Sequence, residues 1–215
     1  MKLPSKIKGW LSTGLTAELS LEKSSEQLLN QYYETNKASD LALLVARFNQ
    51  PVFHFVLTLS DRVTAEDVVQ SMWEKVIHSA QSAKQQTSNL QTSNLQTSNL
   101  QPVKQNIAVK SWLFTIARNT LIDELRRQNR WQNESYEEHA VESFSPEKLL
   151  ELKDRLALFN SALAKLSYAQ REAYVFQQEG FSVVEICQVT GESFETIKSR
   201  LRYARNNLVK LMSQQ

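Results

Sequence analysis

The spacing of apolar residues is helical along most of the chain. Apolar positions recur at steps of three and four residues in the segments 28–59, 64–80, 110–130, 149–166 and 168–212. This is the period of an amphipathic helix and differs from the two-residue alternation of a strand. Only four glycines and four prolines are available for turns, which are too few for a many-stranded sheet. The pattern therefore predicts an all-α protein.

Three residues near the first two segments carry further local information. Pro51 lies inside the segment 28–59, and because proline lacks a backbone N–H and clashes with the preceding turn, two helices are expected to meet there. Thr64 precedes an acidic first turn and is expected to be the N-cap of the next helix. His54 stands alone among apolar residues, which favours a packed core histidine over a metal ligand.

A low-complexity insert separates the segments 64–80 and 110–130. It contains three copies of the pentamer TSNLQ between Thr87 and Gln101, and a five-residue period matches neither a helix nor a strand. Lengthening a surface loop costs only about 0.6 kcal/mol per doubling. We interpret the repeat as a tolerated tandem duplication, with a functional insertion as the alternative.

The net charge of +2 conceals two basic clusters on either side of an acidic stretch. Lysine and arginine crowd the segments 110–130 and 198–210, and seven acidic residues lie between Glu134 and Asp154. This alternation predicts two polyanion-binding units joined by a linker. The expected organisation is a loosely ordered leader at 1–25, a first domain at 26–130 with the insert at 81–106, an acidic linker at 131–148 and a second domain at 149–215.

The C-terminal segment has the pattern of a helix-turn-helix. Capping boxes that begin at Ser167 and Ser182 each predict the start of a helix. A short turn at Gly191 then leads to a basic helix that begins at Ser193. One side of this last helix is apolar and the other carries arginine, lysine, serine and asparagine, as a DNA recognition helix requires.

One face of the segment 110–130 combines an aromatic ring with polar and basic groups. It carries Trp112, Asn119, Asp123, Arg126 and Arg130, at steps of seven, four, three and four residues. Trp112 is either a core residue at the edge of the apolar stripe or a platform on which an unpaired base stacks. Such stacking is worth about 1–3 kcal/mol per base, and the pattern leaves both interpretations open.

Three stretches together, AEDVVQSMWEKVI, KSWLFTIARNTLIDELRR and TIKSRLRYARNNL, resemble the bacterial RNA polymerase sigma factors of the extracytoplasmic-function (ECF) group. The resemblance covers about residues 28–80 and 107–212 and implies two helical domains, region 2 and region 4. It implies a protein that binds core RNA polymerase, directs it to promoters through the −35 and −10 elements, and assists promoter melting. The implied partners are promoter DNA and the polymerase β′ clamp helices and β flap, with an anti-sigma factor as a further candidate.

The resemblance also assigns residues to each contact. Core polymerase binding is assigned to Glu66, Asp67, Gln70 and Trp73; −10 binding to Trp112, Asn119, Arg126, Arg127 and Arg130; and −35 binding to Lys198, Ser199, Arg200, Arg202, Tyr203 and Arg205. Tyr203 stands where the family commonly has arginine. The acidic linker is similar to the one that threads the RNA-exit path in relatives.

Other functional classes find little support in the residues. The sequence has no nucleophile constellation, metal-ligand cluster or glycine-rich phosphate loop, so no enzymatic activity, metal or cofactor is expected. A single cysteine and no apolar run that approaches a membrane span indicate a cytoplasmic protein without membrane insertion. The main rival is a stand-alone helix-turn-helix regulator that binds duplex DNA without polymerase. The N-terminal half, which lacks a receiver-type β/α alternation, argues against it.

Overall fold

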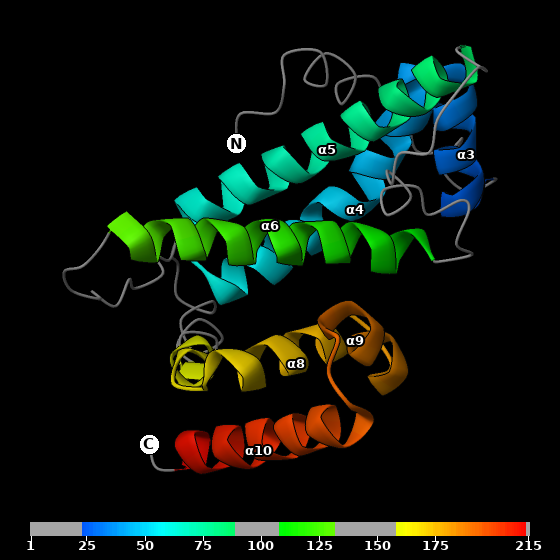
Figure 1. Ribbon diagram of the computed structural model, residues 1–215. Coiled ribbons are helices and arrows are strands. Elements are labelled where there is room, and N and C mark those ends of the chain that lie inside the picture. Colours follow the sequence, from blue (N-terminus) through cyan, green and yellow to red (C-terminus); the bar gives the residue numbers. More distant parts are fainter. Residues whose placement is uncertain (1–22, 89–107, 132–157, 214–215) are drawn as a thin grey trace, which may run out of the picture. The chain divides into compact units, whose positions relative to one another are not determined.

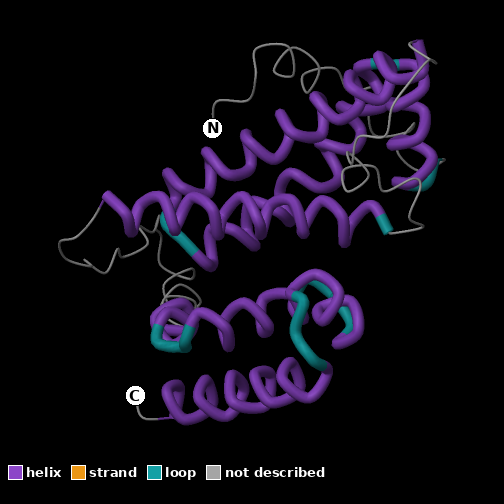
Figure 2. Tube along the Cα trace, viewed as in Figure 1, coloured by secondary structure: helices purple, strands orange, loops and turns teal. Residues whose placement is uncertain are grey.

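The computed structural model describes residues 23–88, 108–131 and 158–213, and every regular element within them is a helix (Figures 1 and 2). The helices are α3 (Ser25–Thr35), α4 (Ala38–Leu59), α5 (Arg62–Ser88), α6 (Val109–Trp131), α8 (Tyr168–Gln178), α9 (Val183–Thr190) and α10 (Phe194–Ser213). The chain divides between Asn129 and Arg130 into two compact units. The all-α prediction is confirmed. Most of the predicted leader, insert and acidic linker lies outside the described residues.

The first unit is a group of helices packed around α4, with α5 and α6 running alongside it (Figure 1). The rings of Phe55 on α4 and Phe114 on α6 lie 5.3 Å apart, and both side chains are fully buried. Lys75 Nζ on α5 donates a hydrogen bond of 2.7 Å to Thr120 Oγ1 on α6. These contacts hold α6 against both α4 and α5.

Helix α4 continues through Pro51, so the prediction that two helices meet there is wrong. Phe48, Val52 and Phe55 are buried on both sides of the proline. Burial of each such side chain contributes about 1.5–3 kcal/mol, which together outweighs a proline cost of about 3 kcal/mol in a helix interior. His54 is exposed on this helix, so its interpretation as a core histidine is also wrong.

The same helix is long and apolar enough, by length and composition alone, to cross a membrane. The expectation that no segment approaches the length and apolar composition of a membrane span is therefore wrong. Half of the most apolar 18-residue window is buried inside the protein, and the core helix of a soluble protein meets the same criterion. Packing against α3, α5 and α6 is sufficient reason for the apolar composition of α4.

Helix α5 is capped by Asp61, not by Thr64 as predicted. Asp61 Oδ1 accepts a hydrogen bond of 2.9 Å from the backbone N–H of Thr64, and Asp61 Oδ2 accepts one of 2.6 Å from Thr64 Oγ1. Burial alone would raise the pKa of Asp61, but these bonds and others from the backbone outweigh it and lower the pKa. Thr64 thus lies in the first turn and serves the cap as a donor.

The far end of α5 also differs from the prediction. The helix spans 27 residues and ends at Ser88, so it includes the first residues of the segment 81–106 that was expected to be an insert. Serine, threonine and glutamine can continue an established helix because extending a helix is much easier than nucleating one. The rest of the TSNLQ repeat lies outside the described residues.

The second unit is formed by the helical segment 158–164 with α8, α9 and α10. One core cluster contains Ala162, Leu163, Leu166, Ala204 and Leu208. A second group of buried side chains joins α8 to the following helices, with the rings of Phe176 and Phe181 5.2 Å apart and Ile186 and Ile197 fully buried. The apolar side of α10 is therefore occupied by the unit's own core.

Local signals at the helix ends of this unit are largely confirmed. Ser182 forms a reciprocal capping box at the start of α9, whereas Ser167 only accepts from the backbone of α8. Gly191 follows α9 in the left-handed conformation at φ 75°, which a glycine adopts without steric strain. Ser193 Oγ then accepts from Thr196 N–H at 3.2 Å, so a helix-turn-helix joins α9 to α10.

Candidate functional site

Polar side chains line one exposed face at the start of α5. Asp67 and Gln70 are exposed, and Gln70 Nε2 donates to Glu74 Oε1 at 3.0 Å. Glu66 is partly exposed and lies 3.3 Å from Arg62 Nε. Exposed ion pairs of this kind contribute at most about 1 kcal/mol, so these side chains are available to a partner at little cost.

Trp73, assigned to the same contact, lies inside the first unit. Its side chain is 1% exposed, and Nε1 donates to Asn49 Oδ1 on α4 at 3.1 Å. The assignment of Trp73 as a direct polymerase contact is therefore corrected: its ring belongs to the core that supports α5. The apolar stripe of the sequence, in which Trp73 follows Met72 and precedes Val76, already contained this signal.

The outward face of α6 carries the polar residues assigned to the −10 element. Asn119, Arg126 and Arg127 are exposed. Arg127 Nη2 lies 2.8 Å from Glu124 Oε2, and Arg126 Nη1 lies 4.0 Å from Asp123 Oδ1. The two guanidinium groups therefore have weak intrahelical partners in solvent and can exchange them for phosphates.

Trp112 is buried, which favours its interpretation as a core residue. Its side chain is 5% exposed, so no face of the ring is open for a base to stack upon in this conformation. Its Nε1 is buried and has no hydrogen-bond partner among the described residues. The side chain of Arg130, also assigned to the −10 element, lies outside what the structure describes.

Helices α5 and α6 also contact each other through polar groups near these faces. The hydrogen bond and charge of Glu124 raise the pKa of Arg127, and the charge of Asp67 on α5 raises it further. Gln128 Nε2 on α6 also donates to Thr64 Oγ1 on α5 at 3.1 Å. The residues assigned to polymerase and to the −10 element therefore belong to adjacent parts of one packed unit.

The second unit presents a basic stripe along α10. Lys198, Arg202 and Arg205 are exposed at steps of four and three residues. Arg205 Nη2 donates to Gln177 Oε1 on α8 at 2.6 Å. The guanidinium carbon of Arg202 lies 5.2 Å from the ring centroid of Tyr203, whose side chain is 51% exposed.

Arg200 differs from the other residues assigned to the −35 element. Its Nη2 lies 2.8 Å from Glu192 Oε1 in the turn, and only 24% of its side chain is exposed. Arg200 therefore joins the turn to α10, while Ser199 beside it is partly exposed. Sequence patterns missed Glu192 because the pair spans eight residues and joins two elements. The two charges come within 2.8 Å of each other only because of the way the turn folds back on α10.

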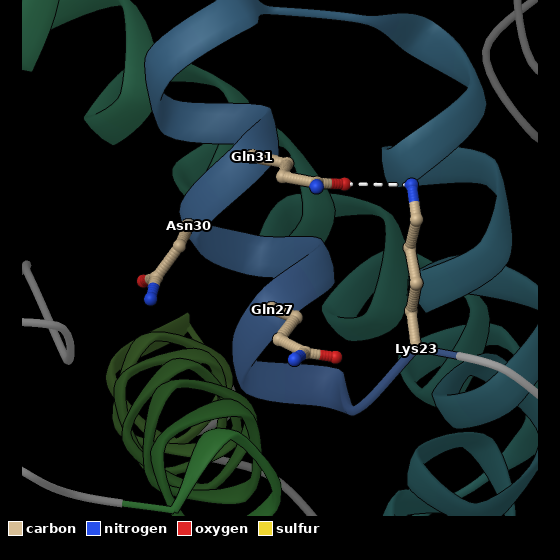
Figure 3. Close-up of a pocket in the computed structure, with 4 residues that line it drawn as sticks. All are labelled: Lys23, Gln27, Asn30 and Gln31. Atoms are coloured by element: carbon tan, nitrogen blue, oxygen red, sulfur yellow. Dashed lines mark hydrogen bonds between the residues drawn. The ribbon is translucent and has the colours of Figure 1, made fainter.

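A pocket lies beside α3 in the first unit (Figure 3). It has a volume of about 430 Å³ and is lined by Lys23, Gln27, Asn30 and Gln31. Lys23 Nζ donates to Gln31 Oε1 at 2.8 Å, and Gln27 Oε1 accepts from Ser24 N–H as part of the helix cap. These internal bonds explain the polar lining without a ligand.

Comparison with known proteins gives a consistent family. A family model described as ECF sigma factor matches residues 62–214. The chain is 38% identical over 100 residues to the ECF RNA polymerase sigma factor SigL of Mycobacterium tuberculosis, covering 44% of this chain and 55% of SigL. It is 32% identical over 109 residues to the ECF RNA polymerase sigma factor RpoE of Cereibacter sphaeroides, covering 49% and 59%. These matches span little more than half the length of either relative.

Two solved structures are also similar. The sigma factor RpoE in complex with the anti-sigma factor NepR from Bartonella quintana has a TM-score of 0.52 at 26% identity, covering 82% of this chain and 98% of that one. CnrH in complex with the cytosolic domain of CnrY has a TM-score of 0.59 at 22% identity, covering 89% and 99%. The second likeness supports the fold alone.

Proposed function

This chain belongs to the ECF sigma factor family, and we propose that it is a cytoplasmic sigma subunit without catalytic activity of its own. It binds core RNA polymerase, directs it to promoters by recognising the −35 and −10 elements, and assists melting. The observation that carries the proposal is the family match over residues 62–214, which includes helices of both compact units. In this proposal residues 26–130 form region 2, 149–215 form region 4, and 131–148 link them.

Core binding is proposed for the exposed face at the start of α5. Asp67 and Gln70 are exposed and Glu66 partly so, which suits a contact with the helical surface of the polymerase β′ clamp. Trp73 contributes only by keeping α5 in position, since its ring is buried. A partner that binds this face replaces the weak solvent-exposed ion pair and hydrogen bond of α5 with its own contacts to these side chains.

DNA contacts are proposed for α6 and α10. On α6, Asn119, Arg126 and Arg127 are exposed donors for the −10 element, and Trp112 supports them from the core. On α10, Lys198 and Arg202 with the neighbouring Ser199 and Tyr203 meet the −35 element in the major groove, as a recognition helix does. The β flap is the proposed polymerase contact of the second unit.

An anti-sigma factor is a further proposed partner. The similar RpoE structure from Bartonella quintana is a complex with the anti-sigma factor NepR. Two small helical units with exposed polar faces provide the kind of surface that such an inhibitor covers. Competition between core polymerase and a candidate inhibitor for the full chain tests this part separately.

Run-off transcription tests the proposed function. The full-length chain and purified core RNA polymerase are combined with a set of genomic promoters, and transcripts are mapped. Promoter-specific transcripts that require the chain are expected. A chain that neither binds core nor supports initiation, yet footprints duplex DNA alone, would instead be a stand-alone regulator.

The same assay decides the role of the repeat. Deletion of Thr87–Gln96 removes two TSNLQ units. Unchanged promoter choice and strength are expected if the repeat is a tolerated duplication. A changed set of promoters would make the insert part of promoter recognition.

A further inference from the structure

An aromatic side chain stands exposed at the beginning of the candidate recognition helix. Phe194 is the first residue of α10, and 47% of its side chain is exposed. It lies three residues before the fully buried Ile197, so helical periodicity alone would assign it to the core. Because no earlier turn of α10 covers it, and side chains lean toward the helix N-terminus, its ring projects from the start of the helix.

The ring is continuous with the basic stripe. Lys198 Nζ lies 5.4 Å from the Phe194 ring centroid and 3.5 Å from Glu195 Oε1. Phe194, Lys198 and Arg202 follow one another at steps of four residues. An apolar ring therefore stands beside cations that suit a DNA backbone or the acceptor atoms of guanine.

We infer that Phe194 is a specificity-determining residue that contacts the 5-methyl group of a thymine in the −35 element, with Lys198 held beside it. The first residues of a recognition helix lie nearest the base edges in the major groove. Of the groups displayed there, the thymine methyl is the apolar one, and phenylalanine is among its known partners. An isolated protein leaves this ring in water, whereas the groove buries it.

The inference deepens the proposed function and rests on it, since it takes α10 to be the reader of the −35 element. It goes beyond that function in naming a residue that the family resemblance does not assign and the base group that the residue detects. The alternative, that Phe194 only shields Lys198, predicts no dependence on a methyl group.

Removal of that methyl group from the DNA isolates the contact. We take a −35 element from a promoter that the holoenzyme recognises and replace each thymidine on either strand, one at a time, by deoxyuridine. The affinity of the holoenzyme for each modified promoter is then measured. With wild-type protein, one of these replacements is expected to weaken binding about fourfold, because burial of one methyl group changes the affinity by about this factor. With Phe194→Ala the same replacement should have no effect, and Phe194→Leu should restore part of it.

Val209→Ala is the matched control. Val209 is 69% exposed on the same helix but lies about 22 Å from Phe194 along the helix axis. This variant should therefore keep the full loss of affinity on deoxyuridine replacement. Equal responses of wild type and Phe194→Ala at every thymine overturn the inference. If wild-type holoenzyme does not discriminate any −35 base change, the proposed function itself fails. Circular dichroism of each variant confirms that the exposed substitutions leave the fold intact.

Discussion

The two units expose their candidate contact residues in different ways. In the first unit, both assigned tryptophans, Trp73 and Trp112, are buried, and the assigned residues that face solvent on α5 and α6 are polar. In the second unit, most assigned residues stand exposed on the single helix α10, whose opposite side forms the core. Substitutions in the first unit therefore mix folding with function more than those on α10 do.

The largest effect is expected from Trp73→Ala. Removal of a fully buried tryptophan typically costs about 3–5 kcal/mol of the free energy of unfolding. Guanidinium denaturation of the full chain, followed by circular dichroism, measures it. Arg202→Ala on α10 is the contrasting control and should change stability by no more than about 0.5 kcal/mol. A Trp73→Ala protein of normal stability that loses only polymerase binding would contradict the buried position.

Replacement of each buried tryptophan by phenylalanine sharpens the contrast within the first unit. Trp73→Phe removes the hydrogen bond that Nε1 donates to Asn49 Oδ1, and loss of such a bond costs about 0.5–1.5 kcal/mol. Trp112→Phe removes a buried N–H that has no partner among the described residues, so no such penalty arises. Trp112→Phe should therefore be the less destabilising variant in the same denaturation assay.

Asp61→Asn tests the cap of α5 and its dependence on pH. The pKa of Asp61 is lowered in the folded protein, so its carboxylate stabilises the fold above the unfolded pKa of about 3.9. That contribution is lost as the pH falls from about 4 through the folded pKa. At pH 7 the variant should lose about 0.5–1 kcal/mol, since asparagine is still a fair cap. The difference between the two proteins should narrow in acid, and a difference that is constant from pH 7 to pH 3 would contradict the charge effect.

The smallest effect is expected in the salt dependence of DNA binding. Arg202→Ala should reduce the slope of log K against log salt concentration by about 0.9, if Arg202 neutralises one phosphate. Lys210→Ala, near the far end of α10, should leave the slope almost unchanged. Binding titrations at four salt concentrations measure both. Equal slopes for the Arg202 variant and wild type would remove Arg202 from the phosphate contacts.

Signals that act over a few residues were predictable from the sequence. The three- and four-residue spacing predicted that the described segments are helical, although not the break between α3 and α4 at Asn36. Ser182 and Gly191 predicted the ends of α9. The continuity of α4 through Pro51 was not predictable in this way, because it depends on packing of residues from other helices. The exposure of Phe194 was not predicted from the sequence. Helical periodicity, which correctly buries Ile197, does not decide burial in the first turn of a helix.

The candidate contact residues show the same difference between local signals and tertiary packing. Charge spacing gave the exposed stripe of α10, since those side chains need no tertiary partner to reach solvent. The burial of Trp112 and the pair between Glu192 and Arg200 depend on elements that meet only in the folded chain. For this reason Arg202, and not Arg200, is the appropriate residue for separating DNA binding from folding.

Whether this chain acts as a sigma subunit is tested by its affinity for core RNA polymerase, measured for the wild type, Asp67→Ala and Arg202→Ala. His78→Ala, another exposed residue of α5, is the matched control. We expect a tight complex that Asp67→Ala weakens about tenfold, or 1.4 kcal/mol, and that Arg202→Ala and His78→Ala leave unchanged. Absence of a wild-type complex, or equal losses in all three variants, would contradict it.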